Sequence, residues 1–364
     1  MTIIELLEKL VAMDGSDLHI IAGLHPAVRV DGQLIPLTGY EELTPSDTQE
    51  LVYSILTEEQ KETFESDKED RYELDFAYSV SGLGRFRCNI HKQRGTVAAS
   101  VRALATHIPK LKELGLPHSV QDFATARKGL VLVAGPTGSG KSTTLAALID
   151  TINSTRCDHI ITVEDPIEYL HNSKKSYISQ REVGFSGDTL SFKNALKFAL
   201  RQDPDVILIG EMRDYETIGI ALTSAERGHL VFGPLHTSGV VETVNRVIDI
   251  FPAEQHNQVR AQFASNLVGV ISQILLPRIN GRGRCVACEV MKTNAAIRNN
   301  IRSGTMESLH HIIETSTSEG MQTMDQSLLK LCQEGKIDYD SARSYVCDKT
   351  VEKRLQQYQR PGRV

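Results

Sequence analysis

The stretch that decides the fold is Gly129-Leu-Val-Leu-Val-Ala-Gly-Pro-Thr-Gly-Ser-Gly-Lys141-Ser-Thr-Thr-Leu145. Its first six residues form a short apolar run, which is typical of a strand buried on both faces. The stretch 141–152 has the composition of a helix. The glycine-rich segment between them satisfies the pattern G-x-x-x-x-G-K-[ST], in which a strand leads through a loop into a helix. The sequence therefore predicts a phosphate-binding loop at this point.

Each residue type in this loop has a physical reason. Glycines let the backbone curl so that successive amides point at one anion, and the following helix adds its positive end. The lysine reaches the β and γ phosphates, and the serine hydroxyl after it binds Mg²⁺. We therefore expect ATP and Mg²⁺ as cofactors, with Ser142 as the metal ligand. The expected nucleotide-binding residues are Gly135, Pro136, Thr137, Gly138, Ser139, Gly140, Lys141, Ser142 and Thr143.

Apolar runs alternate with helical stretches beyond the loop. The runs 160–163, 206–209 and 230–232 indicate buried strands, and this alternation predicts an α/β fold with a parallel sheet. Glu164 directly follows the first run, and Glu211 follows the second after one glycine. An acid at a strand end is by itself usually a loop residue or a helix cap. Beside a phosphate loop, both acids become candidates for polarising the attacking water.

Two histidines, His229 and His236, flank the third run. A lone histidine in such a place is more often a packed or solvated side chain than a reactive one. The pair gains meaning only from the order of motifs described below.

The first hundred residues predict a smaller α+β domain. Thr2 and Glu5 have the spacing of a capping box at the start of an amphipathic helix. Strands are expected at 19–21, at 28–35 with a turn at Asp31-Gly32, at 72–80, and in a hairpin of 85–91 with 96–102. Residues 103–118 carry Pro109, Gly115 and Pro117 and indicate a connector. We expect domains at 1–102 and 119–364, joined by a linker at 103–118.

The last hairpin places two arginines close together if residues 92–95 form its turn. His91 then faces Thr96, and Arg85 lies opposite Arg102. Like charges directly opposite each other in an antiparallel pair are unfavourable, so an anion or a carboxylate is expected between them. The alternative is that both guanidinium groups point into water.

Composition excludes several classes of protein. The 364 residues suffice for two domains, and the apolar fraction of 40% with a charged fraction of 24% is ordinary for a soluble globular chain. A net charge of -6 argues against nucleic acid as the partner. Six scattered cysteines favour a reducing compartment, and Cys285 and Cys288 lack the second close pair that a zinc ribbon needs. The sequence contains no uninterrupted apolar run long enough to predict a membrane span.

Four motifs in order carry a family resemblance. The phosphate loop is followed by Val163-Glu-Asp-Pro-Ile-Glu168, by Gly210-Glu-Met-Arg-Asp214 and by Gly228-His-Leu-Val-Phe-Gly-Pro-Leu-His-Thr237. This order resembles the secretion and pilus motor ATPases, and it is most similar to the PilT-like branch, the type IV pilus retraction ATPases. The resemblance extends from Gly15-Ser-Asp-Leu-His19 to Gly320-Met-Gln-Thr-Met324.

This resemblance implies a RecA-like ATPase domain behind a PAS-like N-terminal domain, in a homohexamer where the small domain packs on the neighbouring subunit. It implies Glu211 as the general base, Glu164 as the acid of the second motif, and arginines of the small domain, Arg85 and Arg102, reaching the nucleotide. His229 and His236 would link nucleotide state to domain movement.

The resemblance also implies partners and a location. We expect an inner-membrane platform protein of the pilus and a second, paralogous motor ATPase as partners, and no nucleic acid. The chain would be cytoplasmic, at the pilus base, with membrane contact only through partners. The expected function is powering pilus retraction and twitching motility.

The alternatives are a pilus-assembly or type II secretion ATPase, a nucleic-acid motor, and a regulatory subunit that binds nucleotide without hydrolysis.

Two positions depart from the family pattern. Asn300 stands where the retraction branch has leucine, and Pro234 stands where threonine is usual. The proline removes a backbone donor, which is expected to alter the end of its strand.

Overall fold

The computed structural model describes residues 1–364 except 31, 67–71, 105–106, 185–186, 281–282 and 359–364. The described chain divides into two compact units. The first comprises residues 1–107 with 168–170 and 182–190, and the second comprises 108–167, 171–181 and 191–364. Asp31 of the predicted turn and residues 105–106 of the predicted linker lie outside the described residues. None of the helices in the described part of the chain is long and apolar enough to cross a membrane.

The first unit is a six-stranded sheet with three helices. The strand order is β3–β2–β1–β6–β5–β4, and every neighbouring pair is antiparallel. All three helices begin at a threonine whose side chain and third following residue form a capping box, which confirms the prediction for Thr2 and Glu5. The elements are β1 (Asp17–Ile20), β2 (Ala27–Val30), β3 (Gln33–Pro36), β4 (Glu73–Val80), β5 (Gly84–Gln93), β6 (Thr96–Ala103), α1 (Ile3–Ala12), α2 (Pro45–Tyr53) and α3 (Glu58–Glu65).

The hairpin of β5 and β6 corrects the predicted register. Gln93 pairs with Thr96, so the turn has only two residues, and Arg102 lies opposite Arg87 rather than Arg85. Both turn residues have positive φ, 51° at Arg94 and 79° at Gly95. The sequence Arg94-Gly95 did not predict this turn, because arginine rarely adopts the positive φ that asparagine or aspartate adopts readily.

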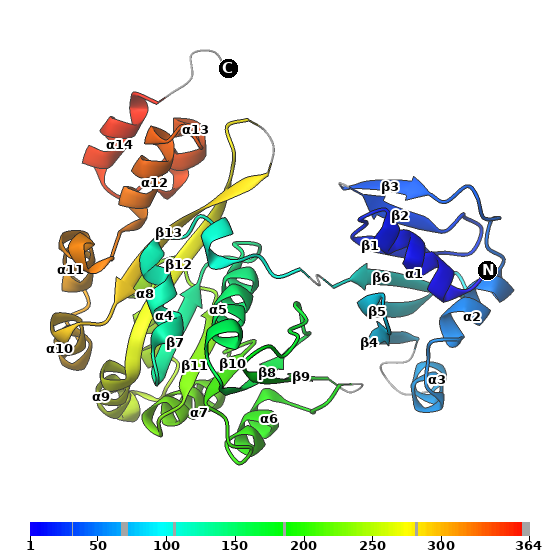
Figure 1. Cartoon of the computed structure of the whole chain (residues 1–364), viewed down its shortest axis with the longest axis horizontal. Coiled ribbons are helices and arrows are strands. Elements are labelled where there is room, and N and C mark those ends of the chain that lie inside the picture. Colours follow the sequence, from blue (N-terminus) through cyan, green and yellow to red (C-terminus); the bar gives the residue numbers. More distant parts are fainter. Residues whose placement is uncertain (31, 67–71, 105–106, 185–186, 281–282, 359–364) are drawn as a thin grey trace. The chain divides into compact units, whose positions relative to one another are not determined.

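The second unit contains a seven-stranded sheet (Figure 1) in the order β13–β12–β7–β11–β10–β8–β9. The five strands from β12 to β8 are parallel, and β13 is antiparallel to β12. The strands are β7 (Gly129–Ala134), β8 (His159–Glu164), β9 (Tyr177–Glu182), β10 (Val206–Ile209), β11 (Leu230–Leu235), β12 (Leu267–Pro277) and β13 (Arg284–Lys292). Strands β7, β10 and β11 are buried over their whole length, as continuous apolar runs predict.

Helices connect and cover these strands. Both α5 and α7 pack against β7 and β11, and the last helices pack on the hairpin of β12 and β13. The helices are α4 (Gln121–Thr125), α5 (Lys141–Thr155), α6 (Phe192–Ala199), α7 (Tyr215–Glu226), α8 (Val240–Asp249), α9 (His256–Asn266), α10 (Ala295–Ser303), α11 (Ser308–Thr315), α12 (Met324–Gln333), α13 (Tyr339–Ala342) and α14 (Lys349–Gln356). A mixed α+β unit followed by a parallel α/β unit is the predicted fold class.

Pro234 does not disturb the end of β11, contrary to expectation. The strand continues through Leu235, whose carbonyl accepts a bond from Gly135 of the neighbouring chain segment after β7. Alternate residues of a strand face opposite neighbours, so the nitrogen of Pro234 faces β10. The pairing with β10 has already ended at Phe232. The proline therefore removes no bond from the sheet.

Cys285 and Cys288 both lie on β13 and are buried. A separation of three residues puts their side chains on opposite faces of the strand. Cys285 packs in the cluster under the C-terminal helices, and Cys288 packs in the core around β7. The two sulfurs therefore serve as separate core residues.

Candidate functional site

The phosphate loop joins β7 to α5 as the sequence predicts. Gly135 has φ 147°, and a Cβ there would lie 2.3 Å from the Gln273 carbonyl oxygen, so only glycine fits. Gly140 adopts the left-handed conformation and is the N-cap of α5. Because glycine has no side chain, it leaves the first-turn amides of α5 available to an anion.

Lys141 begins α5 with its ammonium turned back over the loop. Its Nζ donates to the carbonyl oxygens of Gly135 at 2.8 Å and Pro136 at 3.0 Å, and the residue is only 8% exposed. Ser142 and Thr143 follow in the first turn and are half-buried. The Ser139 hydroxyl is buried and has no hydrogen-bond partner among the described residues. A buried orphan hydroxyl at this place is what a bound phosphate oxygen would satisfy.

Gln273 on β12 holds the loop in shape, and sequence reasoning missed it. Its Nε2 donates to the Ser139 carbonyl at 2.7 Å, and its Oε1 accepts from the Thr144 hydroxyl at 2.8 Å. Gln273 and Thr144 are both almost fully buried. A polar pair, Ser272-Gln273, inside an apolar eleven-residue strand was the signal that could have revealed this residue.

The parallel sheet gathers four predicted features at one edge. The carboxyl ends of β7, β11, β10 and β8 are neighbours in that order. They carry, respectively, the phosphate loop, His236, Glu211 and Glu164. Ligands of open α/β sheets bind at this carboxyl edge, and adjacent strands lie only about 4.8 Å apart.

Glu164 is half-buried at the end of β8 and is held by two donors. The Thr162 hydroxyl donates to Glu164 Oε1 at 2.6 Å, and Gln180 Nε2 donates to the same oxygen at 3.2 Å. Thr162 itself is fully buried. This carboxylate is therefore fixed by its surroundings rather than free to swing in solvent.

Glu211 and His236 share a charged environment with Lys141. Glu211 is ion-paired with Arg213 two residues later. Partial desolvation of the ring is the main cause that lowers the pKa of His236, and the Lys141 ammonium acts in the same direction, while Glu211 opposes it. The imidazole of His236 is therefore electrostatically coupled to both the loop lysine and the acid on β10.

His229 is not brought to this edge. It precedes β11, and its carbonyl pairs with the amide of Gly129 at the start of β7. Its Nδ1 lies 2.8 Å from the Pro204 carbonyl in the turn before β10. A six-residue strand separates it from His236, a length of about 20 Å. His229 therefore lies at the opposite end of β11 from the phosphate loop of its own subunit.

The two predicted arginines belong to the first unit, and each has a carboxylate partner there. Arg85 contacts Glu182 at 3.3 Å, and Arg102 contacts Asp17 at 2.8 Å. Although partial burial opposes it, hydrogen bonds from Ser16 and Arg102 hold the pKa of Asp17 below its ordinary value. The predicted arrangement, with one anion or carboxylate between Arg85 and Arg102, is wrong, because these two arginines are not opposite each other and each pairs with a carboxylate of its own.

A cavity of about 340 Å³ opens beside the phosphate loop. Its lining includes Gly140 of the loop, Thr143 of α5, the apolar Leu275, and three charged residues, Glu113, Arg278 and Arg284. Its volume is in the range of small-molecule sites, and charged, polar and apolar side chains all contribute to its lining.

A phosphate loop at the carboxyl edge of a parallel sheet, with acids on neighbouring strands, defines a P-loop nucleotide-binding protein of the α/β class. Comparison with known proteins narrows this class. The family model described as "Type II/IV secretion system protein" matches residues 93–343. The chain therefore belongs to the Type II/IV secretion system protein family.

Relatives and solved structures agree with this assignment. The chain is 45% identical over 343 residues to the type IV pilus retractation ATPase PilT of Pseudomonas aeruginosa, covering 94% of this chain and 97% of that protein. It is also 45% identical over 323 residues to a twitching motility protein of Neisseria gonorrhoeae, covering 89% and 84%. A crystal structure of the pilus retraction motor PilT with bound ADP matches with a TM-score of 0.89 and 46% identity, covering 98% and 100%. The predicted family resemblance and fold class are confirmed.

Proposed function

We propose that this chain is the ATP-hydrolysing motor that powers type IV pilus retraction, acting as a homohexamer. Similarity to retraction and twitching proteins over nearly the whole chain supports the ATPase and retraction assignments. The observation that carries the chemistry is the carboxyl edge of the second sheet, where Lys141, Glu211 and Glu164 follow neighbouring strands. The predicted ATPase activity and its retraction function agree with these comparisons.

The proposed chemistry assigns a task to each side chain. The loop amides and Lys141 hold the β and γ phosphates and stabilise the charge that develops on them. The Glu211 carboxylate accepts a proton from the attacking water, and Glu164 helps to orient that water. The His236 ring, coupled to both Lys141 and Glu211, responds to the loss of the γ-phosphate.

Mg²⁺ fits the residues present. The Ser142 hydroxyl stands in the first turn of α5, and the carboxylates of Glu211 and Glu164 supply the oxygen atoms that this ion prefers. The ion would neutralise phosphate charge during hydrolysis. In this proposal the Ser142 hydroxyl would hold the ion, and the two acids would supply negative charge beside it.

The proposed arginines act across a subunit boundary. Arg102 is 64% exposed despite its ion pair with Asp17, so its guanidinium is accessible to a neighbouring nucleotide. Mixing Arg102→Ala subunits with Lys141→Ala subunits tests this role. Recovery of part of the ATPase activity in the mixture is expected if the arginine acts in trans, and no recovery would contradict it.

The proposed partners are a pilus platform protein in the inner membrane and a paralogous motor ATPase, with the chain at the cytoplasmic base of the pilus. Deleting the gene in its host and counting pili tests the direction of work. Retraction predicts excess pili and lost twitching, whereas an assembly ATPase predicts bald cells. Phosphate release by the purified oligomer, dependent on Mg²⁺, separates both from a regulatory subunit that does not hydrolyse ATP.

A further inference from the structure

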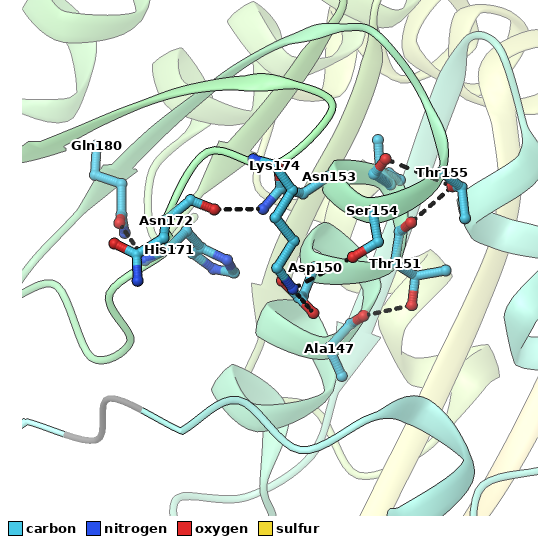
Figure 2. A network of polar contacts seen from close by, with 11 residues as sticks. Ala147, Asp150, Thr151, Asn153, Ser154, Thr155, His171, Asn172, Lys174 and Gln180 are labelled. Carbon is cyan, nitrogen blue, oxygen red and sulfur yellow. Dashed lines mark hydrogen bonds and ion pairs between the residues drawn. The ribbon is translucent and has the colours of Figure 1, made fainter.

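Gln180 on β9 connects two groups of opposite hydrogen-bonding character. Its Oε1 accepts from the backbone N–H of His171 at 2.7 Å, and its Nε2 donates to Glu164 Oε1 at 3.2 Å. A backbone N–H can only donate and an ionised carboxylate can only accept, so these two partners fix which end of the amide faces which. Figure 2 shows Gln180 beside His171.

The segment that receives Gln180 is fastened to the helix of the phosphate loop. Asn153 of α5 is fully buried; its Nδ2 donates to the Asn172 carbonyl at 2.8 Å, and its Oδ1 accepts from the Lys174 amide at 2.9 Å. The Lys174 ammonium also contacts Asp150 of α5 at 2.6 Å. These contacts surround the end of α5 in Figure 2. The helix that begins at Lys141 therefore also positions the segment that orients Gln180.

We infer that Gln180 is a positioning residue that aims the Glu164 carboxylate at the site of hydrolysis. The inference rests on the proposed ATPase function. Thr162 holds the carboxylate from its own strand, and Gln180 holds it from β9. Two donors from different strands remove rotational freedom from a side chain that must be placed to within a fraction of an ångström.

An amide of this length satisfies both ends. Leucine keeps neither bond, and asparagine is one methylene too short. A glutamate at this position keeps the acceptor for His171 but brings a second negative charge against Glu164 when it is ionised. When it is protonated, the same carboxylic acid offers an acceptor and a donor, and so reproduces the amide.

The first experiment measures Mg·ATP turnover by the full-length, assembled protein. Gln180→Leu is expected to lower kcat about 10-fold to 30-fold and to change KM for ATP by less than about twofold, because placement of a catalytic group rather than ground-state binding is lost. The matched control is Gln262→Leu. Gln262 Nε2 donates to Glu226 Oε2 at 2.7 Å, the same chemical pair on α9 and α7, and its loss should leave kcat unchanged.

The second experiment compares Gln180→Glu with Gln180→Leu at several pH values. The ratio of their kcat values is expected to rise as the pH falls from 8 to 6, because the negative charge of Glu164 raises the pKa of the introduced acid and its protonated form regains the donor. The other ionisable groups on these segments, among them Asp165, His171, Lys174 and Arg181, are common to both variants and cancel in the ratio. A role in packing alone would leave this ratio flat.

The outcomes separate this inference from the proposed function. Turnover by Gln180→Leu within about twofold of wild type, or a flat ratio, would overturn the positioning role. If Gln180→Leu does not fold, Gln180→Glu against wild type replaces it, since it keeps the size and the bond to His171, and a ratio independent of pH overturns the inference. Full turnover by Glu164→Gln would instead refute the proposed role of Glu164 itself.

Discussion

The carboxyl and amino edges of the seven-stranded sheet each carry a histidine of the same strand, β11, but the surroundings of the two side chains differ. His236 leaves β11 at the carboxyl edge, beside the charges of Lys141 and Glu211. His229 enters the same strand at the amino edge and lies against the Pro204 carbonyl. Both belong to one motif in the sequence, yet only His236 lies at the edge that carries the phosphate loop of the same subunit. The polarity of a strand, rather than closeness in sequence, decides which residues form a site.

The largest expected effect tests this comparison with two lysines, Lys128 directly before β7 and Lys141 after the loop that follows it. Lys141→Ala removes the ammonium from the loop and should lower kcat/KM for ATP by about 1000-fold or more, a loss of about 4 kcal/mol. Lys128→Ala, at the exposed amino end of the strand, should change it by less than about twofold. Steady-state phosphate release measures both. Wild-type hydrolysis by Lys141→Ala would remove the carboxyl edge from consideration as the nucleotide site.

The second test of the comparison uses two glutamates, Glu211 at the carboxyl edge and Glu226 near the amino edge. Glu211→Gln keeps the shape of the side chain but removes the base, so turnover should fall about 100-fold to 1000-fold while ATP binding is retained. Glu226→Gln, at the end of α7 that leads to the amino edge, is the matched control and should hydrolyse ATP normally. Phosphate release and binding of a fluorescent ATP analogue distinguish the two steps. Lost binding in Glu211→Gln would argue for a structural role instead.

A third histidine, His171, extends the comparison, because burial of its side chain rather than its position at an edge of the sheet decides its charge. Burial lowers the pKa of His171 from 6.5 to about 4. Between these two values the unfolded chain binds a proton that the folded chain does not, so stability falls as the pH drops through this window, by about 3 kcal/mol in all. Chemical unfolding at pH 7 and at pH 4.5 should show a smaller acid loss in His171→Phe. The exposed control His311→Gln should keep the wild-type loss.

The smallest expected effect compares the two histidines directly. His236→Ala should lower kcat about tenfold with unchanged thermal stability, since the ring is coupled to Lys141 and Glu211. His229→Ala should do the reverse, losing about 1 kcal/mol of stability with its bond to Pro204 and keeping kcat. Equal loss of kcat in both variants would show that the amino edge also governs hydrolysis, and the comparison would break.

Much of the fold followed from local patterns. The loop 135–142, the strand before it and the helix after it lie where the motif placed them, because glycine conformations and helix starts are set within a few residues. The capping box of Thr2 and Glu5 was predictable for the same reason. The predicted hairpin register failed at Arg94, where a residue that disfavours positive φ adopts it.

The partners of the site residues were not predictable in this way. Gln273 lies 134 positions from the Ser139 carbonyl that it holds, and Gln180 lies 16 positions from Glu164. The separation along the chain does not identify the partners of these glutamines. Each glutamine bonds to groups on other segments, which only the folded chain brings close to it. Arg85 likewise finds Glu182 across 97 positions.

By itself, the sequence determined the phosphate loop and the alternation of strands and helices, since these depend on contacts between near neighbours in the chain. It also determined the family, since the order of the motifs can be read along the chain. Only the tertiary structure decided that His236 and not His229 joins the loop, and that glutamines from two other strands hold the loop and the acid. The reason is physical: strand order and direction bring distant residues to one edge, and no local pattern encodes that order.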